Sequence, residues 1–534
     1  MIKKNSFVKQ AAILAIASLL VRFIGFLYRL PLTKLIGDEG NGIYSAGYYL
    51  YTFFLIMSSA GLPAAISKMV SERIAKNEYK NAHMVFRISI IIASVVGLIA
   101  SLLIGIGARW FSNAISSPRS FYTIVTLSPT VFIVAVAAVF RGYFQGLKNT
   151  VPTAISQVVE QIFNAVFSVL LAYVLVKKSV ELGAAGGTAG TGIGAFFGLV
   201  VMIWIYYLHR PNIKKDFHSD KTKIIENPKS ISIELIKTAV PIIIGTAIFS
   251  ITNLIDMKMV MTCLTANGAF TEHQADILYG QLTGKYVVLT TLPVSIATAV
   301  ATAVVPNIAS SFILKDMNAV ENKINTALRI TMILSIPAAV GIGVLGHQIL
   351  LMLFPSYPDG GNLLVVGSIS IIFLALAQIA TGILQGIDKV KIPAIAAFFG
   401  ALVKIPLNYV LISNPKINVL GAVISTIGCY SVASVIDLYF MARQMKAMPD
   451  FMGALIKPLI ASFVMGIGCY VSYNLIYMLV SSNTLSLILA ILIGIVIYFI
   501  FLILLKGLKR VDIKLMPMGN KLITLMDKHN ILVD

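Results

Sequence analysis

The chain alternates long apolar runs with short polar breaks along nearly all of its 534 residues. A bilayer core about 30 Å thick is crossed by roughly 20 apolar residues in a helix, and runs of that length recur between breaks rich in charge, glycine or proline. The pattern predicts an all-α polytopic membrane protein with about fourteen transmembrane helices. We place them at residues 8–35, 42–67, 84–108, 121–140, 152–176, 187–208, 236–262, 276–312, 324–346, 362–384, 392–412, 419–442, 453–479 and 484–505.

The first predicted span contains two arginines, Arg22 and Arg29, seven residues apart. Two helical turns place both on one face, about 10 Å apart. A guanidinium keeps its proton, and a position at the bilayer centre costs at least about 2.5 to 3.5 kcal/mol on insertion scales. We therefore predict that this helix lines a polar cavity, where water or an anion offsets that cost.

Charge is scarce but unevenly placed: 58% of the residues are hydrophobic, 12% are charged, and the net charge is +20. Lysines and arginines concentrate in alternate loops and in both tails. By the positive-inside rule, this bias predicts that both termini are cytoplasmic. The longest polar stretch, residues 210–232, is only a loop. The sequence therefore predicts no soluble domain and no nucleic-acid partner.

The sequence motifs do not indicate an enzyme. The three cysteines, Cys263, Cys429 and Cys469, lie in apolar context without CxxC spacing, which argues against a disulfide framework or a thiolate metal site. Residues 280–286 (GQLTGKY) lack the spacing of a Walker A loop and its Ser or Thr after the lysine. We predict a protein that is not an enzyme and has no metal and no cofactor.

Short motifs recur in order along the chain. LPAAI at residues 62–66 returns as LPVSI at 292–296, and FQGL at 144–147 returns as LQGI at 384–387. Any one match is explained equally well by kinks and close helix packing, but the ordered set indicates a parallel duplication. We predict a first six-helix lobe with a cytoplasmic linker (1–232), a second six-helix lobe (233–450), and two further helices with a cytoplasmic tail (451–534).

Cations outnumber anions inside the predicted spans. Five basic residues near cytoplasmic ends are set aside because they can snorkel, namely Arg87, Arg141, Lys237, Arg329 and Lys457. What remains is Arg22, Arg29, Lys258, Lys285 and Lys404 against Glu160 and Asp256, with Asp437 nearer the cytoplasmic end. A surplus of positive charge favours an anionic substrate, and arginine binds phosphate with a bidentate fork.

Structural roles for the same residues stay open. Arg22 and Arg29 could pair with Glu160 or with backbone carbonyls, and Lys258 could snorkel to the outer surface. Lys404 and Asp256 could form a buried ion pair between the two halves of the chain.

Residues 21–26 (VRFIGF), followed by LIG at 35–37, resemble the first helix of the MurJ-type lipid II flippases. This family and its relatives, including stage V sporulation protein B, belong to the multidrug, oligosaccharidyl-lipid and polysaccharide exporter superfamily. The similarity covers nearly the whole chain. It implies two six-helix lobes around a central cavity that opens alternately to each side of the bacterial cytoplasmic membrane. The last two spans would form a groove for a polyprenyl tail.

The resemblance also assigns roles to residues. Arg22 matches the family's first-helix arginine, Arg29 lies one position from the second, and Lys285 stands for a cation on span 8; these three would bind substrate. Some relatives hold sodium with an acidic residue on span 7 and polar residues on span 11. Here Asp256 and Asn408 correspond, and the ammonium of Lys404, one turn earlier, would replace the ion. With Glu160, these residues would serve coupling or gating.

The implied function is a flippase that moves a polyprenyl-diphosphate-linked precursor, lipid II, from the inner to the outer leaflet without breaking a covalent bond. Membrane potential, Na⁺ and H⁺ remain open as the coupling force. Expected partners are the anionic lipid-linked oligosaccharide, membrane lipids and cell-wall synthesis proteins. The alternatives are an exporter of another lipid-linked oligosaccharide, a cation-coupled multidrug antiporter, which would normally have twelve spans and an acidic cavity, and a membrane scaffold.

Overall fold

The computed structural model is built of helices, and the residues it describes contain no β-strand. It describes residues 4–508 except 219, 221, 223, 267, 390, 446–449 and 451. The all-α prediction is therefore confirmed. Large apolar side chains remain exposed on the outer faces of many helices, for example Met478 (79% exposed) and Ile106 (85%). Such faces are stable only against lipid, so the chain is a multi-pass membrane protein.

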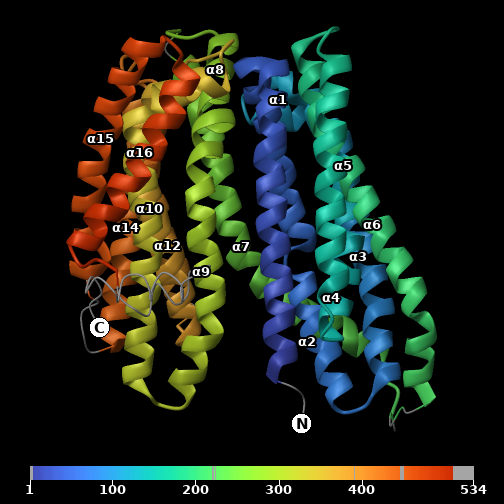
Figure 1. The fold of residues 1–534 in the computed structure, drawn as a ribbon. Coiled ribbons are helices and arrows are strands. Elements are labelled where there is room, and N and C mark those ends of the chain that lie inside the picture. Colours follow the sequence, from blue (N-terminus) through green and yellow to red (C-terminus); the bar gives the residue numbers. More distant parts are fainter. Residues whose placement is uncertain are drawn as a thin grey trace. The chain divides into compact units, whose positions relative to one another are not determined.

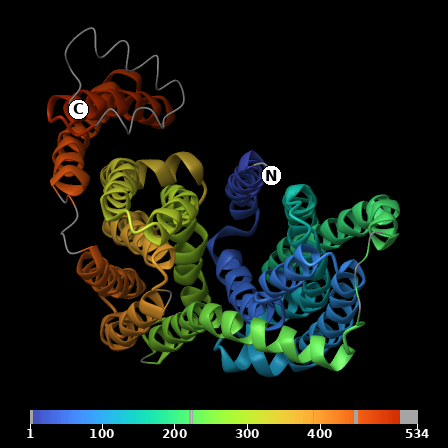
Figure 2. The ribbon, with the colours of Figure 1, turned by 90° about the horizontal axis from the view of Figure 1, so that it is seen from below.

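The chain divides into two compact units, Met1–Gly280 and Gln281–Asp534. Seen from below, the helices of each unit are viewed largely end-on, as in a bundle (Figure 2). The first unit contains α1 (Lys4–Ser59), α2 (Leu62–Ala75), α3 (Tyr79–Ala114), η1 (Pro118–Ser120), α4 (Phe121–Gly146), α5 (Val151–Leu175), α6 (Val180–His218), α7 (Pro228–Thr265) and α8 (Glu272–Gly280).

The second unit begins with a π-helix, η2 (Gln281–Tyr286), which continues directly from α8. It then contains α9 (Val287–Ile313), α10 (Met317–Leu353), α11 (Gly361–Gly367), α12 (Ile369–Gly386), α13 (Lys391–Ile412), α14 (Leu420–Met445), the short π-helix η3 (Met452–Ile456), α15 (Lys457–Val480) and α16 (Asn483–Leu504).

Helix α1 consists of two arms joined at Gly37, where φ is 68° and ψ is −174°. This left-handed backbone favours glycine, which has no Cβ to clash. Asn41 stabilises the break, since its Nδ2 donates to the Gly37 carbonyl at 2.9 Å. The first arm (4–36) matches the first predicted span, whereas the second predicted span, 42–67, covers most of the second arm (38–59) and runs into α2. Figure 1 shows the long blue helix.

Twelve helical stretches within the described residues are long and apolar enough to cross a membrane. The first, Ile16–Ala75, is 60 residues long and covers the first arm of α1 from Ile16 onward, the second arm and α2. Helix α7 has 38 residues, covers the predicted span 236–262, and is not among the twelve. The count of fourteen therefore stays a prediction.

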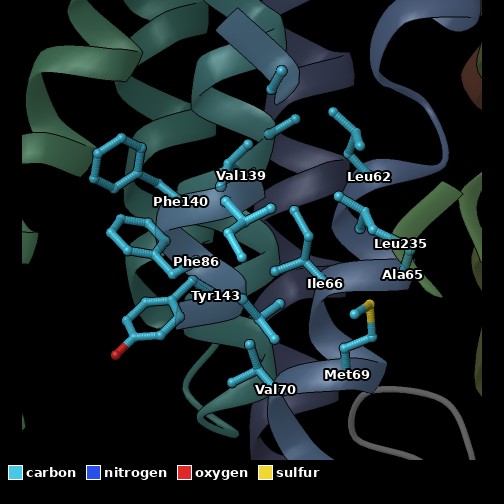
Figure 3. Close-up of a cluster of buried hydrophobic side chains, with 14 of the residues drawn as sticks. Leu62, Ala65, Ile66, Met69, Val70, Phe86, Val139, Phe140, Tyr143 and Leu235 are labelled. Carbon is cyan, nitrogen blue, oxygen red and sulfur yellow. The ribbon is translucent and has the colours of Figure 1, made fainter. Parts of the chain in front are cut away.

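The core of the first unit is built around α2, α3 and α4. Phe86 packs edge-on against Phe140 and at a tilt against Tyr143, and Ile66 and Val70 of α2 lie beside these rings (Figure 3). Full burial of a side chain of this size contributes about 1.5–3 kcal/mol.

Helix α7 joins the same core at its start, through Ile231, Leu235 and Ala239. At the junction of α1 and α2, Gly61 allows this contact, since a Cβ there would lie 2.5 Å from the Ala239 carbonyl oxygen. Packing thus places α7 and α8 with the first unit, whereas the repeat assigns residues from 233 onward to the second lobe. The two units are defined by packing and the predicted lobes by sequence repetition. The packing therefore does not test the predicted lobe boundaries, which stay a prediction.

Candidate functional site

Arg22 lies on the first arm of α1 with an exposed side chain. One turn later, Gly25 brings this arm against α5, because a Cβ at Gly25 would lie 3.2 Å from Nε2 of Gln161. The arm therefore passes a polar face of α5. Of the three predicted substrate cations, Arg22 is the one with an exposed side chain, whereas Arg29 is half-buried and Lys285 is buried.

Arg29 contacts aromatic rings. Its guanidinium carbon lies 4.4 Å from the ring centroid of Tyr44, which stacks on Tyr48 with centroids 5.8 Å apart. In a straight helix, residues 29 and 44 would be about 22 Å apart, so the contact exists because the chain turns back at Gly37. A desolvated cation–π contact contributes about 2 kcal/mol. Arg29 is thus held by tyrosines in this state.

Glu160 of α5 is paired with Arg141 of α4, at 2.5 Å between Oε2 and Nη2. The same Nη2 donates to Oγ of Ser156 at 3.0 Å, and Nε does so at 3.2 Å. The side chain of Arg141 is 13% exposed and that of Glu160 is 27% exposed. In the sequence analysis Arg141 was set aside as a snorkelling residue, but in the structure it pairs with Glu160, the carboxylate that Arg22 or Arg29 could have used.

The polar face of α5 continues one turn beyond Glu160. Oγ of Ser168 donates to Oδ1 of Asn164 at 2.8 Å and is also 2.7 Å from the carbonyl of Gly187 on α6. Gly194 of α6 packs against Asn164. The face therefore forms an interior polar layer shared by α5 and α6, with its hydrogen bonds largely satisfied inside the first unit.

Lys285 is 1% exposed and lies in the π-helix η2. Its Nζ donates to the carbonyls of Tyr357 at 2.6 Å and Asp359 at 2.9 Å, and it lies 5.7 Å from the Phe354 ring centroid. These contacts fix the loop between α10 and α11. A substrate role for Lys285 stays a prediction, and in this state it would require breaking both hydrogen bonds.

The predicted coupling residues fall in different units. Asp256 is half-buried on α7 of the first unit. Lys404 and Asn408 are buried on α13 of the second, where Oδ1 of Asn408 accepts a short hydrogen bond from Ser425. Their pairing across the units stays a prediction. Lys258 is exposed on α7, in keeping with the snorkelling alternative.

A cluster of ion pairs and hydrogen bonds, which the sequence analysis did not predict, connects the loop before α7 and the start of α7 to α2 and α3. Arg73 is buried and bonds Glu226 at 2.5 Å and Glu234 at 2.7 Å. Asp220 accepts from the backbone N–H of Tyr79 at 3.0 Å. Burial opposes ionisation of Asp220, yet hydrogen bonds from Thr222 lower the pKa of its carboxyl below the usual range. The sequence offered one signal for this group, namely basic and acidic residues in the polar stretches that separate the apolar runs.

An apolar hollow of about 330 Å³ lies in the second unit between α10, α15 and α16. Pro337, Gly341 and Met465 line it, with Cys469, Tyr498 and other apolar side chains.

Two hydrogen bonds hold the last helices against α10. The backbone nitrogen of Pro337 has no hydrogen to donate to the carbonyl of Ile333, and the hydroxyl of Tyr498 donates to that carbonyl at 2.7 Å. At the other end, Nδ2 of Asn483 donates to the Gln348 carbonyl at 3.1 Å. Two polar contacts thus hold the last helices on α10 around a space that would suit a hydrocarbon chain.

Comparison with known families gives two matches. Residues 7–312, more than half of the chain, match the family described as polysaccharide biosynthesis protein. Residues 286–410 match the MatE family.

Two proteins of Bacillus subtilis (strain 168) are similar in sequence. The lipid II flippase MurJ is 28% identical over 81% of each chain. Stage V sporulation protein B is 25% identical over 97% of this chain and 99% of its own length.

Solved structures share the fold. A lipid II flippase MurJ in an inward closed conformation gives a TM-score of 0.65 at 18% identity, covering 91% of this chain and 97% of that one. An inward-facing multidrug resistance MATE family transporter of the MOP superfamily gives a TM-score of 0.61 at 14% identity, covering 79% and 98%. At these identities the likeness concerns the fold.

Proposed function

Because the chain belongs to the polysaccharide biosynthesis protein family, within the MOP superfamily of MurJ-like and stage V sporulation protein B-like proteins, we propose that it is a flippase for a lipid-linked oligosaccharide. The finer proposal is that the cargo is lipid II and that it moves from the inner to the outer leaflet, with both termini in the cytoplasm. The protein makes and breaks no covalent bond.

The observation that carries the proposal is the engagement of Glu160 by Arg141. Because this carboxylate already has a partner, it does not neutralise Arg22 and Arg29 on the first arm of α1. The interior of the first unit then presents positive charge to a diphosphate, which a guanidinium binds through two parallel hydrogen bonds. Arg22 would make the first contact, and Arg29 would follow if it left the tyrosines.

The apolar hollow supplies the second requirement of such a cargo. A polyprenyl chain stays in hydrocarbon while its head group crosses, so the protein needs an apolar surface beside the polar route. The hollow between α10, α15 and α16 offers an apolar surface within the second unit. A membrane potential, negative inside, would favour outward movement of an anion by about 2.3 kcal/mol per charge per 100 mV.

The proposal is tested at Arg22 in a strain depleted of its own lipid II flippase. Arg22→Ala should abolish rescue at normal expression, because it removes a cation from the membrane interior without creating a cavity in the core. Arg22→Lys should restore rescue only in part, since an ammonium lacks the planar fork. Arg87→Ala, at another exposed arginine within a helix, is the matched control and should rescue fully.

Full rescue by Arg22→Ala would overturn the assignment of the cation. Failure of the unchanged protein to rescue, with transport of a different polyprenyl-linked sugar, would favour the second candidate, an exporter of another lipid-linked oligosaccharide. The match to the family described as polysaccharide biosynthesis protein favours keeping that candidate.

A further inference from the structure

Four charged residues from four elements meet beside the break at Gly37 in α1. Arg119 of η1 donates from Nη2 to Glu39 of the second arm, and from Nε and Nη2 to Oε1 of Glu181 on α6 at 2.8 and 2.6 Å. Its Nη1 reaches Oδ2 of Asp276 on α8 at 3.3 Å. His273 of α8 adds a contact to Glu39 at 3.1 Å. All of these residues lie in the first unit.

The second arm of α1 and helix α8 touch backbone to backbone beside this cluster. A Cβ at Gly42 would lie 2.1 Å from the carbonyl oxygen of Asp276, and one at Gly280 would lie 1.7 Å from that of Asp38. Neither glycine therefore tolerates a side chain while the two segments are in contact. The contact is dry as well as close, since Ala275 and Tyr279 of α8 are 0% and 2% exposed.

The charges alone would drive these elements apart. Arg119 faces three carboxylates, and the Asp276 side chain is only 3% exposed. Like charges brought together in a poorly solvated place repel strongly, so one guanidinium with three separate donors holds the group together. A lysine could not replace it, because an ammonium is a point charge without the fork.

We propose that Arg119 is the hub of a latch that holds α8 against the second arm of α1. α8 leads directly into η2, the first element of the second unit, so its release frees the segment that joins the two units. This inference rests on the proposed function. In the conformation of the structure the latch is closed, and its opening is a step of the transport cycle. The Gly42–Gly280 contact is the surface that the latch keeps shut.

The test measures opening without any substrate. Full-length protein in lipid nanodiscs, with Cys263, Cys429 and Cys469 replaced by alanine, carries Ala275→Cys as a buried reporter on α8. A charged, water-soluble maleimide should label the reporter slowly in the parent. Arg119→Gln should speed labelling by about tenfold, the factor that corresponds to 1.4 kcal/mol in the equilibrium between shut and open. Arg109→Gln, at an arginine that lies over the Phe121 ring, is the matched control and should leave the rate unchanged.

A second variant separates the latch from a general loss of structure. Adding Glu39→Gln and Asp276→Asn to Arg119→Gln removes the repulsion and should return the labelling rate toward that of the parent. If Arg119→Gln does not insert, Asp276→Asn alone replaces it and should give a smaller increase. An unchanged rate in whichever variant is tested, or no recovery in the triple variant, overturns the latch. Faster labelling in a protein that transports no lipid-linked sugar would keep the latch and reject the proposed function.

Discussion

Arg141 and Glu160 decide how much positive charge the interior of the first unit presents. Arg141→Gln leaves a partly buried carboxylate without its cation, and loss of one partner of a buried pair costs about 3 to 5 kcal/mol. The 27% exposure of Glu160 places the expected loss toward the lower figure. Thermal unfolding in detergent should show a clear loss for Arg141→Gln, a small one for Glu160→Gln, and partial recovery in the double variant. Equal, additive losses would show that the two residues act separately.

The sequence singled out Arg22, Arg29 and Glu160 as candidates because a charge in an apolar run is conspicuous. It misplaced Arg141, although this residue and Glu160 lie within about three helical turns of the same loop at 147–150. Two helices joined by a short loop are antiparallel neighbours, and that geometry was the missed signal. The contact between Arg29 and Tyr44 could not be predicted, because it depends on one backbone angle at Gly37.

At the scale of elements, Tyr498 connects α16 to the bend of α10. Tyr498→Phe removes the donor to the Ile333 carbonyl, which Pro337 already leaves without a partner in its own helix. A buried acceptor left unsatisfied costs about 1 to 3 kcal/mol. The variant should therefore unfold at lower temperature and release α16 to protease earlier. Tyr470→Phe, at an exposed tyrosine of α15, should match the parent, and equal behaviour of both variants would contradict the role of the hydrogen bond.

Apolar run length gave most elements close to their observed positions, such as the predicted 152–176 against α5 at Val151–Leu175. The π-helix η2 was not predicted, because it lies within one continuous helical stretch, between α8 and α9, that was predicted as a single span. Proline positions predict where a carbonyl lacks its helical partner. They do not predict that a tyrosine 161 residues away supplies the donor, as Tyr498 does for Pro337.

At the scale of the whole molecule, Asp256 and Lys404 lie on helices of different units, and their pairing is a prediction. Asp256→Asn and Lys404→Met should each impair transport, and the double variant should recover part of the loss if the two charges neutralise each other. We also expect transport to depend only weakly on sodium, because in the proposed pair the ammonium of Lys404 would take the place of the ion. A strong sodium requirement with additive effects of the two substitutions would refute the pair.

The break at Gly37 also bears on how the chain enters the membrane during synthesis. The first arm alone is a poor candidate for stable insertion, because it exposes two permanent cations to hydrocarbon. The second arm follows at once and brings Tyr44 to Arg29. The two arms are therefore best inserted together as a helical hairpin, so that the ring covers one guanidinium before the rest of the first unit has left the ribosome. Glycine at position 37 would then govern biogenesis as well as the finished fold.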